Sequence, residues 1–161
     1  MLNKALVVID IQNDITKNYK EIIDNINKAI DWAVDNDIHV AYIRNEFITE
    51  NARKFKPNTY GAELVPDLKI VSKNVFIKHK ASALSSIEFA DFISKNGICD
   101  FYIAGADATC CVKTTVYNLC KANYNVTVLS DCITSWDKKK IPEMLNYYES
   151  KGGKIIGVNT L

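Results

Sequence analysis

The run Ala5-Leu6-Val7-Val8-Ile9-Asp10 decides the fold, because five consecutive apolar residues end abruptly on a carboxylate. A short apolar run of this kind is typical of a strand that is buried on both faces of a sheet. Similar runs return along the chain, and longer amphipathic stretches separate them. Strands that alternate with helices predict an α/β fold with a mainly parallel sheet between layers of helices.

This alternation predicts six strands and four helices. The strands are expected at 5–10, 38–44, 74–78, 100–105, 125–130 and 154–158. The helices are expected at about 19–36, 86–96, 111–123 and 139–151. Residues 45–70 are rich in polar and turn-forming residues, which predicts a long loop or lid with one short helix.

The bulk properties exclude several classes of function. A length of 161 residues, 48% of them hydrophobic, predicts a single packed domain over 1–161. A net charge of +1 gives no field that would attract nucleic acid or an anionic membrane, so neither is expected as a partner. The five cysteines have no CxxC spacing, and the first apolar run is too short for a signal peptide or a membrane span. We therefore expect a cytoplasmic protein.

Three chemically useful residues follow the predicted strands. Asp10 ends the first, Lys78 ends the third, and Cys111 comes shortly after the fourth. Ligands of open parallel sheets bind beyond the carboxyl ends of the strands, where the strand order reverses. If the order is 3-2-1-4-5-6, Asp10, Lys78 and Cys111 face one crevice.

These residues suit acyl transfer through a thiolate. Cys111 would lie at the first turn of a helix, where the helix dipole and Lys78 lower the pKa of a thiol. Asp10 could accept the thiol proton and later return it to a leaving amine. The backbone N–H groups of Asp107 and Cys111 could form an oxyanion hole. Each residue alone also has a structural interpretation, as a cap, a surface charge or a small core residue.

Four segments resemble the isochorismatase-like cysteine hydrolases. The Val7-Val8-Ile9-Asp10-Ile11-Gln12-Asn13-Asp14 stretch is similar to the opening strand of that family and the Gln-Asn-Asp run after it. Gly61 to Asp67 resembles the stretch before the third strand. Lys78-His79-Lys80-Ala81-Ser82-Ala83-Leu84 resembles the segment that carries the catalytic lysine, and Gly105-Ala106-Asp107-Ala108-Thr109-Cys110-Cys111-Val112 resembles the nucleophile loop. The likeness covers nearly the whole chain.

The resemblance implies a three-layer α/β/α domain in which Asp10, Lys78 and Cys111 form a catalytic triad. It also implies a cis peptide bond between Ala106 and Asp107. Residues expected to line the substrate pocket are Ile15, Glu46 and His79.

Two departures from the family pattern narrow the expected chemistry. Ile15 and Ala81 replace aromatic residues, and Ala108 and Thr109 alter the nucleophile loop, so a pocket that stacks a flat ring such as nicotinamide is not expected. Nicotinamidases of this family hold a metal through an Asp and several His, but this chain has only two histidines. We therefore expect no metal and no cofactor. Cys110 is expected to be a small helix-start residue that faces away from the pocket.

The sequence thus predicts a metal-independent hydrolase that cleaves a C–N bond of a small amide or ureide through a cysteine thioester. An isochorismatase-type vinyl-ether hydrolase, a non-catalytic binding or regulatory member of the fold, and a thiol redox enzyme are the alternatives. The resemblance further implies a homo-oligomer, either a dimer or a tetramer.

Overall fold

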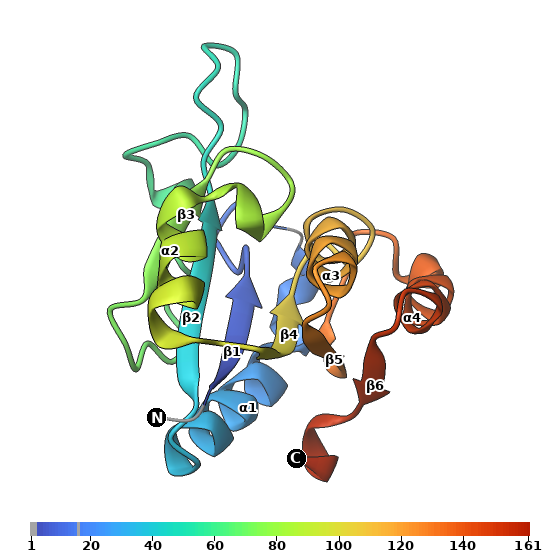
Figure 1. Cartoon of the computed structure of the whole chain (residues 1–161). Helices are drawn as coiled ribbons and strands as arrows, with labels where there is room; N and C mark the ends of the chain where they lie inside the picture. Colours follow the sequence, from blue (N-terminus) through green and yellow to red (C-terminus); the bar gives the residue numbers. More distant parts are fainter. Residues whose placement is uncertain (1–2, 16) are drawn as a thin grey trace.

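A six-stranded sheet forms the centre of the computed structural model, which describes residues 3–15 and 17–161. The strand order β3-β2-β1-β4-β5-β6 is the order predicted from the sequence, and every neighbouring pair is parallel (Figure 1). The strands are β1 (Lys4–Ile9), β2 (His39–Asn45), β3 (Val75–Lys78), β4 (Asp100–Gly105), β5 (Asn125–Ile133) and β6 (Lys154–Ile156). The predicted α/β fold class is confirmed.

Helices cover both faces of this sheet and give three layers (Figure 1). The α-helices are α1 (Ile23–Asp35), α2 (Ile87–Asn96), α3 (Cys111–Lys121) and α4 (Ile141–Ser150). The apolar side of α1 packs on one face, and α2, α3 and α4 pack on the other. Alternate residues of β1 enter the two cores, as expected for a strand whose side chains point to both faces.

The central pair of strands approaches closely at one glycine. Gly105 ends β4 beside Ile9 with a φ of 122°, and a Cβ there would lie 2.1 Å from the Ile9 carbonyl oxygen. Only glycine fits this position. The close contact sets the carboxyl ends of β1 and β4 side by side.

The helix starts differ from the sequence prediction. The helix predicted from residue 19 begins at Ile23, because Lys17–Glu21 form a separate 3-10 helix. The helix predicted from residue 139 begins at Ile141 after a 3-10 turn at Lys138–Lys140, with Pro142 in its first turn, where proline needs no N–H partner.

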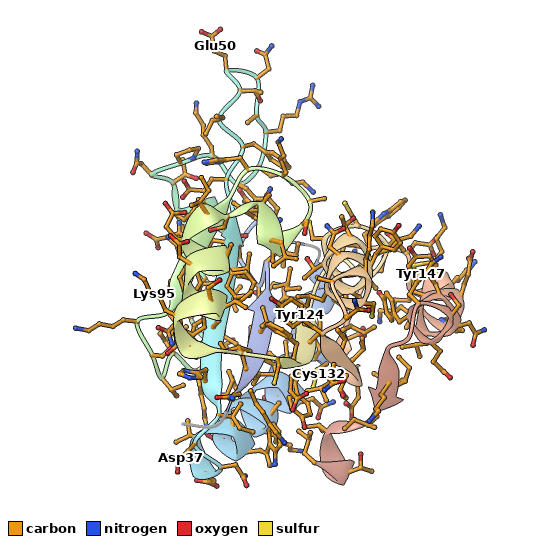
Figure 2. The ribbon with its side chains drawn as sticks, in the orientation of Figure 1. Asp37, Glu50, Lys95, Tyr124, Cys132 and Tyr147 are labelled. Carbon is orange, nitrogen blue, oxygen red and sulfur yellow. The ribbon has the colours of Figure 1, made fainter. Side chains whose placement is uncertain are left out.

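The long connection between β2 and β3 projects beyond the carboxyl ends of the strands, and Figure 2 places Glu50 at its tip. It contains one short helix, Tyr60–Ala62, as predicted. Asp14 fastens it by accepting a hydrogen bond from the Phe55 amide at 2.9 Å. None of the helices in the described residues is long and apolar enough to cross a membrane. The domain predicted over 1–161 includes residues 1, 2 and 16, which lie outside the described residues.

Candidate active site

The three residues predicted from the strand ends meet at the carboxyl edge of the sheet. Asp10 follows β1, Lys78 ends β3, and Cys111 opens α3 just after β4. The Lys78 ammonium lies 3.2 Å from Asp10 Oδ2 and 3.4 Å from Cys111 Sγ. The side chains of Lys78 and Asp10 are almost fully buried, whereas Cys111 is only partly so. A buried cation therefore joins a carboxylate to a thiol.

Lys78 is held in place by two further acceptors. Its ammonium donates to Asn45 Oδ1 at 3.1 Å and to the Lys80 carbonyl at 3.0 Å. Asn45 is in turn fixed by Gln12, whose side chain accepts from the Asn45 N–H at 2.8 Å and donates to the Asn45 carbonyl at 2.9 Å. The same Gln12 amide donates to the Ala62 carbonyl at 2.8 Å. Gln12 thus ties together the ends of β1, β2 and the long connection.

Asp10 is a strained and poorly solvated carboxylate. Its φ of 54° lies in the left-handed region, which residues other than glycine rarely adopt. Its Oδ1 atom is buried and has no hydrogen-bond partner among the described residues. Burial raises the pKa of Asp10, while Lys78 and the Cys111 thiol oppose that rise. A carboxyl group with a raised pKa and one open oxygen can exchange a proton with a bound molecule.

The thiols of the two adjacent cysteines shift each other's pKa in opposite directions. Their thiols hydrogen-bond to each other, which lowers the pKa of Cys110 to about 6 and raises the pKa of Cys111. Desolvation and Asp10 further oppose a charge on Cys111, and Lys78 favours it. Such a pair loses its first proton as a unit. The expected lowering of the Cys111 pKa was therefore wrong for that thiol alone, because its neighbour competes for the charge.

Cys110 precedes the first residue of α3, as expected for a residue at the helix start. Its φ of −132° and ψ of −91° are not helical, and its side chain is exposed. That it faces away from the pocket stays a prediction.

Most backbone N–H groups of the loop 106–112 have an acceptor within the protein. The Ala106, Ala108 and Thr109 amides donate to the Ile9 carbonyl, the Thr134 carbonyl and Asp107 Oδ1, respectively. The amides of Cys110 and Val112 both donate to the Asp107 carbonyl. Across the described stretch 106–112, the N–H groups of Asp107 and Cys111 are those left without an acceptor. The peptide bond between Ala106 and Asp107 is cis.

Asp107 and Tyr148 brace this loop from two sides. Asp107 Oδ1 accepts from Ser135 Oγ at 2.9 Å, and Asp107 Oδ2 accepts from the Trp136 amide at 3.1 Å. The buried Tyr148 hydroxyl of α4 donates to the Ala108 carbonyl. The loop is therefore anchored both to the end of β5 and to the last helix.

The residues predicted to line the substrate pocket lie in two different surroundings, and their contact with a substrate stays a prediction. Ile15 packs against the core beneath α1. Glu46 and His79 lie together, with His79 Nδ1 2.8 Å from the Glu46 carbonyl oxygen, and both line a cavity of about 770 Å³ along β3. The residues lining that cavity include Lys78 but neither Asp10 nor Cys111.

The end of β2, where the family resemblance would place metal ligands, does not suit a metal ion here. The Glu46 carboxylate pairs with Arg44 at 3.2 Å, and the Asn45 side-chain oxygen accepts from Lys78. No group of three His, Cys, Asp or Glu side chains in the described part of the chain is arranged to hold a metal. Two neighbouring cations, Arg44 and Lys78, and one carboxylate, that of Glu46, do not form a binding site for a divalent metal ion.

Sequence reasoning gave no role to Gln12, Asn45 and Tyr148. Gln12 carried a signal, since it stands in the Gln-Asn-Asp run that resembles the family motif. Asn45 and Tyr148 act through contacts across 33 and 40 residues, which no local pattern reveals.

Solved structures with this fold include a pyrazinamidase from Pyrococcus horikoshii in complex with zinc. It is 23% identical, with a TM-score of 0.86 over 97% of this chain and 99% of that chain. Another is an N-carbamoylsarcosine amidase from Thermoplasma acidophilum, 19% identical, with a TM-score of 0.87 over 99% of both chains.

A relative from Arabidopsis thaliana, named as a probable inactive nicotinamidase, is 28% identical over 155 residues, which is 80% of this chain and 79% of that protein. The model of the isochorismatase domain matches residues 4–160. The expected resemblance is confirmed, and the chain belongs to the isochorismatase-like hydrolase family.

Proposed function

We propose that this protein hydrolyses a C–N bond of a small amide or ureide through a thioester on Cys111, without a metal ion. The observation that carries the proposal is the pair of unpaired N–H groups at Asp107 and Cys111, in a loop whose other amides between 106 and 112 are all bonded. Two such donors next to a thiol suit the oxyanion of an attacked carbonyl group.

The chemistry would run in two halves. The Cys111 thiol passes its proton to Asp10 as sulfur attacks the carbonyl carbon, and the oxyanion is held by the Asp107 and Cys111 amides. Asp10 then protonates the leaving nitrogen, which departs as an amine or ammonia and leaves the thioester. In the second half a water molecule gives a proton to Asp10 and attacks the thioester, and Cys111 regains that proton as the acid is released.

The electrostatics of the site support these roles. The raised pKa of Asp10 brings the carboxyl closer to neutral pH, which suits a group that must accept and return a proton. Lys78 contacts both Asp10 and Cys111, so it can stabilise the carboxylate and the thiolate in turn. Removal of one oxyanion donor typically costs about 2.7–4 kcal/mol of activation free energy.

The choice of an amide substrate rests on the thiol. Vinyl-ether cleavage needs no sulfur nucleophile, so Cys111 would have no role in that alternative. The amidase name of the Thermoplasma structure agrees with amide chemistry. The ion pair between Arg44 and Glu46 favours a reaction without a metal, in contrast to the zinc-bound Pyrococcus protein.

A non-catalytic role is the second candidate, because the Arabidopsis relative is named as probably inactive. The two candidates separate in one experiment. Wild type, Cys111→Ala and Cys99→Ala are incubated with a panel of small amides and ureides, and the intact mass and released amine are measured. Cys99 is exposed, and its amide donates to the Asn3 carbonyl at the amino end of the strands, so its variant is the matched control.

We expect amine release and an acyl adduct with wild type and Cys99→Ala, and neither with Cys111→Ala. Turnover by Cys111→Ala would overturn the thioester mechanism. No release from any protein across the panel would favour the binding role.

A further inference from the structure

Two cysteines stand side by side where the nucleophile loop meets α3. Cys110 precedes the first residue of the helix, and Cys111 begins it. The side chain of Cys110 is exposed. That of Cys111 is partly buried, with the Lys78 ammonium 3.4 Å from its Sγ atom. The hydrolysis proposed above uses the second thiol and gives the first no role. An accessible thiol beside a second thiol is typical of cysteines that respond to oxidants.

The surroundings of Cys110 favour its thiolate, which is the form that reacts with oxidants. The thiol of Cys111 donates a hydrogen bond to it, and this contact lowers the pKa of Cys110 to about 6. Lys78 acts in the same direction, whereas burial, Asp107 and Asp10 oppose it. At pH 7 a thiol with a pKa of about 6 is about 90% ionised, against about 3% for an ordinary thiol with a pKa of about 8.5.

The peptide unit between the two cysteines is held by few hydrogen bonds. The Cys110 carbonyl accepts from the Thr114 amide at 2.9 Å, and the Cys111 N–H has no acceptor among the described residues. The backbone of Cys110 is not helical, and its side chain makes no capping hydrogen bond. This unit must turn before the two sulfur atoms can bond, and the turn would strain one hydrogen bond of α3.

A disulfide between neighbouring residues is easily reversed. Consecutive Cα atoms lie about 3.8 Å apart across a trans peptide bond, whereas the Cα atoms of bridged cysteines usually lie about 4.4–6.8 Å apart. The short separation strains the bridge, and strained bridges are reduced more readily than relaxed ones. Such a bridge would form with an oxidant and open again with a thiol reductant.

We propose that Cys110 is a site of oxidation by hydrogen peroxide, and that Cys111 captures the oxidised Cys110 in a reversible disulfide. The Cys110 thiolate attacks one peroxide oxygen and the O–O bond breaks. The hydroxide that leaves takes up a proton, which gives Cys110 sulfenic acid and water. The Cys111 sulfur then attacks the Cys110 sulfur, the S–O bond breaks, and the hydroxide leaves as water with the Cys111 proton. The two thiols together lose two electrons, and the peroxide is reduced to water.

The bridge would remove both groups that Cys111 contributes to the proposed hydrolysis. It consumes the thiol, and it turns the N–H group assigned to the oxyanion. Oxidation should therefore stop hydrolysis, and reduction should restore it. This effect on turnover rests on the proposed function, whereas the bridge itself is detected by mass without any substrate.

The test is peptide mass mapping of the full-length protein after treatment with hydrogen peroxide at about pH 6, where an ordinary thiol is barely ionised. Cleavage at aspartate and lysine releases peptide 107–113, whose cysteines are Cys110 and Cys111 alone. In wild type this peptide should become lighter by two hydrogens, and dithiothreitol should restore its mass. Cys99→Ala is the matched control, because it removes an exposed thiol with no cysteine beside it and should leave the result unchanged.

Cys111→Ala removes the thiol that captures the sulfenic acid. Its Cys110 should accumulate as sulfenic acid, which dimedone traps on peptide 107–113. Its Cys110 should also be oxidised about tenfold more slowly than that of the wild type, because the hydrogen bond from Cys111 is lost and less thiolate is present at this pH.

Two outcomes for the wild-type peptide would overturn the proposal. One is a gain of oxygen without the loss of two hydrogens, and the other is an unchanged mass under conditions that oxidise Cys99. Oxidation of Cys110 at the same rate in wild type and Cys111→Ala would overturn the part given to the contact between the two thiols.

Discussion

Replacing Lys78 by methionine should destabilise the protein far more than an exposed lysine does. Lys78 Nζ and Asp10 Oδ2 lie 3.2 Å apart, and their side chains are 0% and 1% exposed. With an effective dielectric constant of about 20, two unit charges at that distance attract by about 5 kcal/mol. Part of this attraction offsets the desolvation of the two groups. Loss of one partner from a buried pair typically costs about 3–5 kcal/mol, which is the loss expected for Lys78→Met.

The matched control is Lys69→Met. Lys69 Nζ lies 2.6 Å from Asp31 Oδ2, a shorter distance than in the buried pair, but the two side chains are 49% and 54% exposed. Exposed pairs contribute about 0–1 kcal/mol, so this variant should unfold almost as wild type does. Burial, and not distance, is predicted to decide the difference.

The loss of stability caused by Lys78→Met should also depend on pH. Without the ammonium, the raised pKa of Asp10 rises further, because Lys78 was opposing the effect of burial. A folded-state pKa above the unfolded value of about 3.9 means that the ionised form opposes folding. The destabilisation should therefore be small near pH 4 and grow as pH rises toward the folded-state pKa, by up to about 1.36 kcal/mol per pH unit. A double variant that also carries Asp10→Asn should lose this dependence and recover much of the stability.

The measurement is urea unfolding, followed by circular dichroism, of all four proteins from about pH 5 to about pH 8. A loss for Lys78→Met no larger than for Lys69→Met would refute the view that a buried, mutually dependent ion pair holds the site. A large loss without pH dependence would refute the role given to Asp10.

Three other outcomes are expected. Tyr148→Phe leaves the buried Ala108 carbonyl without its hydrogen-bond donor. The free energy of unfolding measured in urea should fall by about 1–3 kcal/mol, and unchanged stability would contradict this. In an activity assay kcat should fall while KM stays the same. Gln12→Glu replaces the group that donates to two backbone carbonyls by one that only accepts. Calorimetry should show Tm lower by roughly 2–4 °C for each kcal/mol of stability lost, and an unaltered Tm would argue against the role of Gln12 in joining the strand ends. Cys111→Ala removes the hydrogen bond that lowers the pKa of Cys110 to about 6. The rate of Cys110 alkylation, followed against pH by peptide mass mapping, should then have its midpoint at about 8.5. An unchanged midpoint would count against the interaction between the two thiols.

Two features could be predicted from the periodicity of apolar residues and from the topology of parallel sheets. They are the sheet itself and the proximity of Asp10, Lys78 and Cys111. An apolar run bounded by polar residues marks a buried strand, and parallel strands bring all their carboxyl ends to one edge. The order of the strands and the resemblance then place the three residues together. None of these inferences needed the conformation of a side chain.

The parts that could not be predicted depend on local backbone detail. The thiol of Cys110 approaches that of Cys111 because the residue before α3 leaves the helical region, a change of two dihedral angles that no pattern of residue types encodes. Glu46 and His79, which directly follow β2 and β3, line the cavity along β3, and their places depend on the loops that leave those strands. The periodicity of apolar residues identifies a strand. The direction in which a residue beside that strand points depends on the residue at which the strand ends.

The contact between Tyr148 and the Ala108 carbonyl bears on the order in which the molecule matures. All three residues of the proposed triad precede α4 in the chain, yet the loop that presents Cys111 is braced by a residue of α4. A nascent chain that has released residues up to 121 therefore contains every reacting group but lacks this brace. The proposed hydrolytic activity should therefore appear only late in folding, when α4 docks, and newly made chains should be inactive before that step.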